Sequence, residues 1–203
     1  MKKEAAFFLI LFTCLTASSS AQRVETEKIY ACGDDRVLLI DATSSTEEAE
    51  IVWEWKAAGS RGLPESYLSI MRTNDDCKPV DGGRKLLVTS SGGGVVLVER
   101  ASGNSLFYAS VPNAHSAEYL PGGRIVVALS TAEKGNSLEL YDEKRPEQVL
   151  FRDSLYSGHG AVWVEARERL FALGGTELRS YSLLDWDSEK PGLKLEETWA
   201  LPD

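Results

Sequence analysis

The sequence has few of the residues that most often carry chemistry or cross-link a fold. Among 203 residues there are two histidines, three cysteines and two methionines. Acidic side chains outnumber basic ones by 31 to 22, which gives a formal net charge of −9 at pH 7. A surface of this sign repels phosphate backbones, so nucleic acid is a poor candidate partner. Helical periodicity is nearly absent, and short apolar runs alternate with Gly, Asp, Asn and Ser clusters, as in strands joined by tight turns.

The N-terminus has the features of a secretory signal peptide. Two lysines precede an apolar run over residues 5–15, and small residues follow up to Ala21. This order predicts a signal peptide over residues 1–21 and export to the periplasm or the exterior. The apolar run is too short to span a bilayer, and no later segment is long and apolar enough to form a transmembrane helix. Cys14 lacks the small residues that precede a lipoprotein cleavage site, which argues against lipidation.

The strongest signal in the rest of the chain, residues 22–203, is an internal repeat. The segments around His115 and His159 align with each other at the spacing of these two histidines. An earlier copy lies 40 residues upstream, where "LLVTS" (86–90) matches "VVALS" (126–130). A partial copy, "IYACGDDRVLLID" (29–41), precedes it. Self-similarity at a fixed period of this length is typical of repeat architectures.

Each full copy contains four short strands, named A to D here. In the third copy they are expected at residues 115–120, 125–130, 138–142 and 148–152. Four strands in ~40–45 residues form one blade of a β-propeller, so the predicted fold is all-β with four-stranded antiparallel blades. A β-sandwich does not predict the internal similarity, and a linear β-solenoid usually has shorter repeats.

About four blades are visible in the sequence. A partial blade over 28–55 lacks an A strand, and full blades follow at about 74–111, 114–155 and 159–200. The last residues, 199–203, lie where a further A strand is expected to begin. The sequence is therefore predicted to be a fragment of a larger ring.

Blade topology places both histidines at one mouth of the central channel. The A strands line the channel and the B strands run antiparallel to them, so the start of A, the end of B and the B–C loop share one face. His115 and His159 begin A strands in neighbouring blades, and Asp75 holds the equivalent position one blade earlier. Loops on such a rim commonly bind ligands on a rigid scaffold. The predicted ligand-binding residues are His115, His159, Asp75, Asp34, Ser90 and Ser130.

Two interpretations of the histidines stay open. Repetition favours a structural cause, in which each imidazole bonds to a neighbouring blade as the histidine of the WD repeat does. The functional interpretation is contact with a ligand, or a divalent metal ion held by His115, His159 and Asp75 with positions left open. The spacing of these residues matches no recognised metal motif.

The glycine run and the paired tryptophans are assigned to the fold. "SSGGGV" (90–95) joins two strands, so its glycines are expected to serve turn geometry rather than phosphate binding. Trp53 and Trp55 alternate along an outer strand, which favours packing between blades over a platform for sugars.

The longest gap between strands, residues 56–76, is either a lid or a filler. Pro64 is placed to open a short helix that ends near Met71. Arg61 and Arg72 are the cations in this segment that would meet an acidic ligand.

Cys32 and Cys77 are the cysteines left after residue 21, and they are expected near one face of adjacent blades. Export permits a disulfide between them. Packed sheets lie about 10 Å apart, which argues against the bond unless the loops bend. Two buried free thiols are the alternative.

Five segments resemble a family of exported bacterial β-propellers, found mainly in Bacteroidetes, with a WD40-like repeat architecture and no established function. They are "ACGDDRVLLID", "NDDCKPVDGG", "LLVTSSGGGVVLV", "NAHSAEYLPGGRIVVALS" and "GHGAVWVEARERLFALGG". The resemblance covers essentially all of residues 22–203. It implies the fold, export and a further Gly-His segment beyond residue 203, because family members are longer. It brings no accepted catalytic residues.

Three functions remain open. The first is a binding module for a glycan or protein ligand at the channel mouth, which the absence of a nucleophile–base pattern favours. The second is a metal-assisted polysaccharide lyase or hydrolase, with a divalent metal ion as cofactor. The third is a non-catalytic interaction scaffold. The sequence does not decide whether the protein is an enzyme, and it does not give the oligomeric state.

Overall fold

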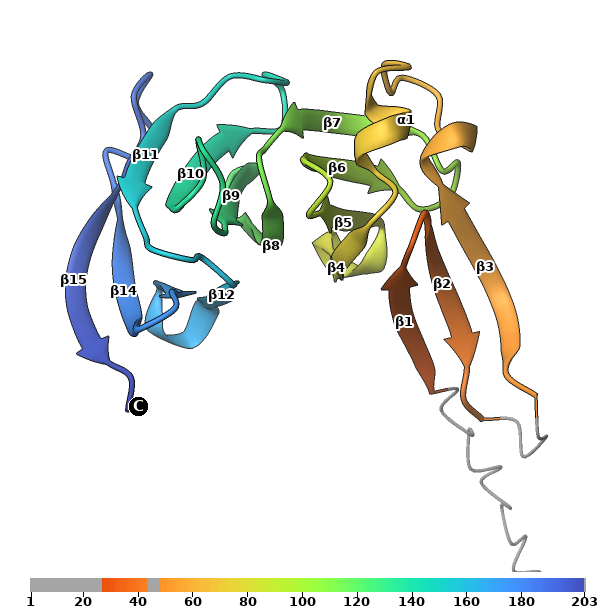
Figure 1. Cartoon of the computed structure of the whole chain (residues 1–203), viewed down its shortest axis with the longest axis horizontal. Helices are drawn as coiled ribbons and strands as arrows, with labels where there is room; N and C mark the ends of the chain where they lie inside the picture. The colour runs from red at the N-terminus through yellow and green to blue at the C-terminus, as the bar shows by residue number, and fades with distance from the viewer. Residues whose placement is uncertain (1–26, 44–47, 203) are drawn as a thin grey trace, which may run out of the picture.

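The computed structural model describes residues 27–43 and 48–202. The predicted signal peptide and Cys14 lie outside these ranges. The described residues form antiparallel sheets that follow one another around an arc (Figure 1). The prediction of an all-β fold built from antiparallel blades is confirmed.

The four blades follow each other in chain order. Blade 1 contains β1 (Lys28–Gly33), β2 (Arg36–Asp41) and β3 (Glu50–Lys56). Blade 2 contains β4 (Asn74–Val80), β5 (Lys85–Ser90), β6 (Gly94–Glu99) and β7 (Ser105–Ser110). Blade 3 contains β8 (Ala114–Leu120), β9 (Arg124–Leu129), β10 (Ser137–Asp142) and β11 (Phe151–Ser154). Blade 4 contains β12 (Gly160–Val164), β13 (Arg169–Leu173), β14 (Glu177–Leu184) and β15 (Gly192–Ala200).

Strand β1 runs in the sense of a B strand. The N–H of Asn74, at the start of β4, donates to the carbonyl of Asp34, just after β1, at 2.9 Å. In the same way the N–H of Gly158, just before β12, donates to the carbonyl of Leu129 at the end of strand B in blade 3, at 3.1 Å. Blade 1 therefore supplies strands B, C and D within the described residues, while β4, β8 and β12 are the innermost A strands of the other blades.

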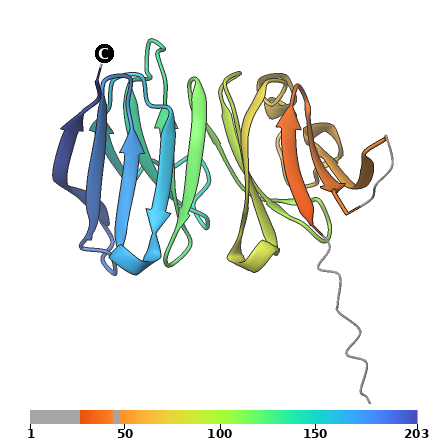
Figure 2. The same ribbon diagram turned by 90° about the horizontal axis from the view of Figure 1, so that it is seen from below.

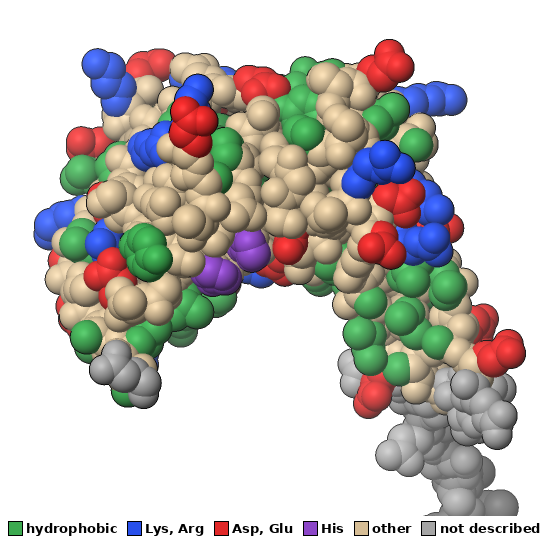
Figure 3. Space-filling view, viewed as in Figure 1, with side chains coloured by type: hydrophobic (Ala, Val, Ile, Leu, Met, Phe, Trp, Pro, Cys, Tyr) green, Lys and Arg blue, Asp and Glu red, His purple; other side chains and the backbone are tan. Residues whose placement is uncertain are grey.

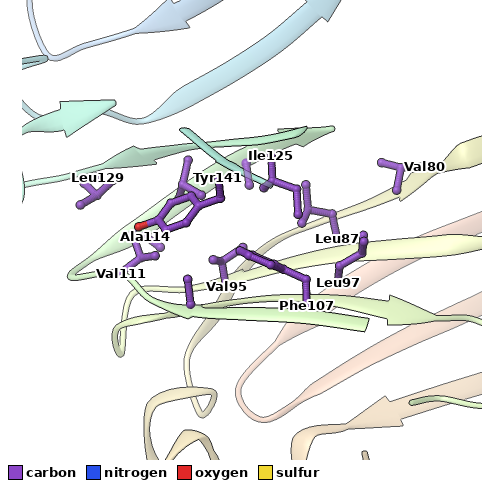
Figure 4. Close-up of a cluster of buried hydrophobic side chains, with 13 residues drawn as sticks. Val80, Leu87, Val95, Leu97, Phe107, Val111, Ala114, Ile125, Leu129 and Tyr141 are labelled. Atoms are coloured by element: carbon purple, nitrogen blue, oxygen red, sulfur yellow. The ribbon is translucent and has the colours of Figure 1, made fainter. Parts of the chain in front are cut away.

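The core consists of the layers between adjacent blades. Between blades 2 and 3, Phe107 and Tyr141 are almost fully buried and meet edge to face, with ring centroids 5.7 Å apart (Figure 4). Val95 and Leu97 from blade 2 and Ile125 from blade 3 pack in the same cluster. Two similar clusters join blade 1 to blade 2 and blade 3 to blade 4. Burying such side chains contributes about 1.5–3 kcal/mol each, which holds the blades in one body.

The two tryptophans of β3 pack between blades, as predicted. Trp55 is 3% exposed, and its indole N–H donates to the carbonyl of Gly103 in blade 2 at 3.1 Å. Trp53 packs against the same cluster and meets Tyr30 edge to face.

The segment between β3 and β4 is a filler. It contains the one-turn helix α1 (Tyr67–Ile70), which begins after Pro64 because the Pro64 carbonyl accepts the N–H of Tyr67 at 3.0 Å. Tyr67 and Met71 are buried against the cluster between blades 1 and 2. These side chains close the gap between the two blades.

Strand β11 begins three residues later than expected. Glu147 has a φ of 65°, and its N–H donates to the carbonyl of Tyr108 in blade 2 at 3.1 Å. Its carboxylate also accepts a hydrogen bond from the hydroxyl of Tyr67. Glu147 thus packs on blade 2, and the chain returns to its own sheet at Leu150, whose N–H donates to the carbonyl of Leu140 in β10 at 2.8 Å.

Candidate functional site

One face of the arc gathers the starts of the A strands, the B–C loops and the D–A connections. It is the upper edge of the molecule in Figure 2. We call this face the histidine rim. It is formed by residues 34–35, 69–73, 91–93, 111–115, 131–136, 155–159 and 174–176.

The structure brings His115 and His159 into contact. The pairing of β8 with β9 shifts register between Ala114 and Ser116, so His115 is the extra residue of a β-bulge, a feature that redirects a side chain. His159 lies just before β12, and its N–H donates to the carbonyl of Leu173 at 2.8 Å. The two imidazole centroids lie 4.7 Å apart, on the inner side of the arc (Figure 3).

Each imidazole has one nitrogen held by its own segment. Nε2 of His115 lies 3.1 Å from Oδ1 of Asn113, and Nδ1 of His159 lies 2.6 Å from the carbonyl oxygen of Ser157. Because both of these oxygens are acceptors, each nitrogen donates and the tautomer is set. Nδ1 of His115 and Nε2 of His159 have no hydrogen-bond partner in residues 27–43 and 48–202. In the neutral rings these two nitrogens are acceptors available to a ligand.

Asp75 occupies the same bulge position in β4 that His115 occupies in β8, since the pairing of β4 with β5 shifts register between Asn74 and Asp76. Its exposed carboxylate accepts the backbone N–H of Ser91 and so caps the B–C turn of its own blade. Asp34 is exposed in the matching turn of blade 1, with a φ of 48°.

The hypothesis of a metal site at His115, His159 and Asp75 does not fit the geometry. Across the described ranges no three or more His, Cys, Asp or Glu side chains are grouped to hold a metal ion. The two imidazoles are together, but the carboxylate of Asp75 turns to Ser91 in its own blade.

Ser90 and Ser130 correct the predicted ligand-binding set. Both are buried, at 0% and 4% exposure, beside the residues that lead into the A strand. The hydroxyl of Ser90 donates to the carbonyl of Thr73 at 2.9 Å, and the N–H of Ser130 donates to the carbonyl of Asn113 at 2.9 Å. These serines hold the A and B strands together and do not reach the surface.

Sequence reasoning missed a polar network on the inner strands, centred on Lys78. Its Nζ donates to the carbonyl of Ala161 at 2.7 Å and to the hydroxyl of Ser116 at 3.3 Å, so one side chain ties β4, β8 and β12 together. The same Nζ lies 3.4 Å from Asp76 and 3.5 Å from Glu118. We call these five residues the inner-strand network. The sequence signal for this network is that two consecutive A strands each carry polar residues two positions apart, Asp76 and Lys78 in β4 and Ser116 and Glu118 in β8.

Tyr156 is a second residue that sequence reasoning missed. It lies in the D–A connection three residues before His159 and is 62% exposed. Its carbonyl accepts the N–H of Gly175 at 2.9 Å, and a Cβ on Gly175 would lie 3.3 Å from its ring. Because Gly175 has no side chain, the ring of Tyr156 can pack close to this B–C loop.

A cavity of about 360 Å³ opens where blade 1 meets α1. Its lining includes Asp35, Lys56, Ser69 and Arg72, so of the two arginines considered above, Arg72 reaches a cavity. Arg61 lies elsewhere, because its carbonyl accepts the N–H of Ser105 at the start of β7. The cavity is of a size that takes a small ligand.

The sequence matches the model of a family of unknown function, DUF6528, over residues 13–184. The chain belongs to this family. No curated protein matches it at a significant level. Within residues 27–43 and 48–202, no helix is long and apolar enough to cross a membrane.

Two solved structures that resemble this DUF6528 chain are a WD40 domain and a chain of a protein complex. The C-terminal WD40 domain of Sif2 matches with a TM-score of 0.58 and 14% identity, over 84% of this chain and 44% of that one. A chain of the mitotic checkpoint complex matches with a TM-score of 0.60 and 8% identity, over 83% of this chain and 49% of that one. The chain thus spans less than half the length of either structure. The likeness shows the fold, a WD40-like propeller.

Proposed function

We propose that this chain is an exported, non-catalytic binding module that holds a polypeptide segment of a partner protein on the histidine rim. The observation that carries the proposal is the contact between His115 and His159. Each ring has one nitrogen fixed by its own chain and the other directed to no group of the described protein. A neutral imidazole nitrogen accepts a hydrogen bond, and an extended peptide offers backbone N–H groups as donors.

The surroundings of the pair support recognition of a protein. Tyr156, three residues before His159 in the chain, is 62% exposed, and tyrosine is enriched among the residues that dominate binding energy at protein interfaces. The inner-strand network beneath the rim is tied across three blades, which supplies a rigid base. One similar structure belongs to a protein complex, the mitotic checkpoint complex.

The proposal assigns no reaction to the rim. Metal-assisted cleavage of a polysaccharide would need a third ligand beside the imidazole pair, and within the described residues Asp75 does not supply it. A glycan offers hydroxyl donors to the same nitrogens, so it is the competing ligand class in the test.

The test is selection of ligands by the full chain from a displayed peptide library and, in parallel, from a glycan array. We expect peptides to be enriched, and we expect their affinity to fall at least about tenfold in the double variant His115→Ala/His159→Ala and in Tyr156→Ala. Removal of a central side chain at an interface typically costs more than about 1.4 kcal/mol, which is tenfold in Kd.

The matched control lies on the opposite rim. Asp187→Ala and Lys190→Ala change exposed residues in the C–D connection of blade 4, and both variants should bind as the wild type does. Enrichment of glycans alone would show that the ligand is a glycan and not a peptide. Peptide binding that the rim variants leave unchanged would show that the histidine rim is not the binding site.

A further inference from the structure

Cys32 lies in β1 and Cys77 in β4, which are neighbouring strands of two different blades. Cys32 pairs with Val37 across the β1–β2 ladder, and Cys77 pairs with Val88 across the β4–β5 ladder. Both cysteines pack against the buried cluster that joins blades 1 and 2. In the structure both are free thiols and partly exposed, where the sequence left a disulfide or two buried free thiols open.

The two thiols lie within reach of each other, so that Cys77 can donate a hydrogen bond to the sulfur of Cys32. This bond from Cys77 lowers the pKa of Cys32, although burial and the nearby carboxylates of Asp75 and Asp76 act in the opposite direction. The same bond, together with burial, raises the pKa of Cys77. Cys32 is therefore the thiol of the pair that loses its proton more readily, and the thiolate is the nucleophile in thiol chemistry.

We propose that Cys32 and Cys77 form a thiol–disulfide exchange pair, which takes a low-molecular-weight disulfide as co-substrate and links blade 1 to blade 2 by a reversible disulfide bond. The inference concerns a part of the fold separate from the imidazole pair, and it holds whatever ligand the histidine rim binds. Both cysteines are partly exposed, so a small disulfide reaches them.

The exchange takes two steps. The Cys32 thiolate attacks one sulfur of the small disulfide, a mixed disulfide forms, and the other half leaves as a thiolate that takes up a proton. Cys77 then loses its proton to solvent and attacks the Cys32 sulfur, which forms the Cys32–Cys77 bond and releases the second half as a thiol. In total, two protein thiols are oxidised and one small disulfide is reduced to two small thiols.

The bond constrains the part of the fold with the fewest strands. Blade 1 has three strands in the described structure, and the link closes the chain between residues 32 and 77, which includes β2, β3 and α1. A cross-link over a loop of this length restricts the unfolded chain strongly. We expect oxidation to raise the melting temperature by about 5–15 °C.

The experiment uses the full chain with Cys14 replaced by serine, equilibrated with mixtures of reduced and oxidised glutathione. Peptide mapping under non-reducing conditions should show one cross-link between the peptides that carry Cys32 and Cys77, with a fraction that follows the glutathione ratio. Addition of a dithiol reductant should reverse both the link and the rise in melting temperature.

Single variants test the assigned roles. Cys77→Ser should trap a mixed disulfide of glutathione on Cys32, because the resolving thiol is gone. Cys32→Ser should leave Cys77 modified several-fold more slowly. Two free thiols after oxidation, mixed disulfides that persist on the two-cysteine protein, or links only between molecules would each overturn the proposal.

Discussion

Replacement of Phe107 by alanine is expected to lower the free energy of unfolding by about 3–5 kcal/mol. The ring is fully buried between blades 2 and 3 and meets Tyr141 edge to face. Its removal takes away the transfer free energy of the ring and leaves a cavity lined by strands of both blades. For a chain of this size the loss corresponds to a melting temperature lower by roughly 10 °C or more. Denaturant titration and calorimetry measure both quantities.

Leu106 provides the control within the same strand. It is the preceding residue of β7, where the pairing with β6 shifts register, and it is 42% exposed. Leu106→Ala should cost at most about 1 kcal/mol, because the side chain is partly in water in the folded state. Equal losses for the two variants would contradict a core located between the blades.

Replacement of Lys78 by methionine is expected to cost about 2–3 kcal/mol of stability. The ammonium group donates to the carbonyl of Ala161 and the hydroxyl of Ser116, and it neutralises two carboxylates on adjacent blades. Methionine keeps much of the apolar length but leaves these acceptors without their donor. Since three inner strands meet at this side chain, hydrogen exchange should also rise in β4, β8 and β12.

Lys56→Met is the matched comparison for Lys78→Met. Lys56 has a side chain that is 39% exposed and one ion pair, 3.6 Å from Glu54. Exposed pairs of this kind contribute about 0–1 kcal/mol, so this variant should be near the wild type. An equally small effect for Lys78→Met would show that the inner-strand network does not hold the blades.

The repeat in the sequence was sufficient to predict the blades. The alignment that places Asp75, His115 and His159 at equivalent positions corresponds in the structure to a bulge in β4, a bulge in β8 and the residue before β12. Strand period and turn residues are local properties, so a single sequence reports them. The contact between the two imidazoles depends on the distance between the inner strands of blades 3 and 4. That distance cannot be deduced from a single sequence.

The errors share a physical cause. Ser90 and Ser130 were assigned to the rim because they end B strands, but both are buried beside the residues that lead into the A strand of the same blade. Lys78 was overlooked because its partners, Ser116 and Ala161, lie 38 and 83 residues away in the chain. Burial and side-chain reach across blades are properties of the assembled arc.

The most direct test of the rim as a binding site is nitrogen NMR of the imidazoles during titration with a selected peptide. The chain has only two histidines, so the four ring nitrogens can be assigned by comparison with the single alanine variants. We expect Nδ1 of His115 and Nε2 of His159 to shift with saturating peptide, while Nε2 of His115 and Nδ1 of His159 keep their bonds to Asn113 and Ser157 and change little. Ring nitrogens that all stay unchanged while the peptide binds would contradict the account.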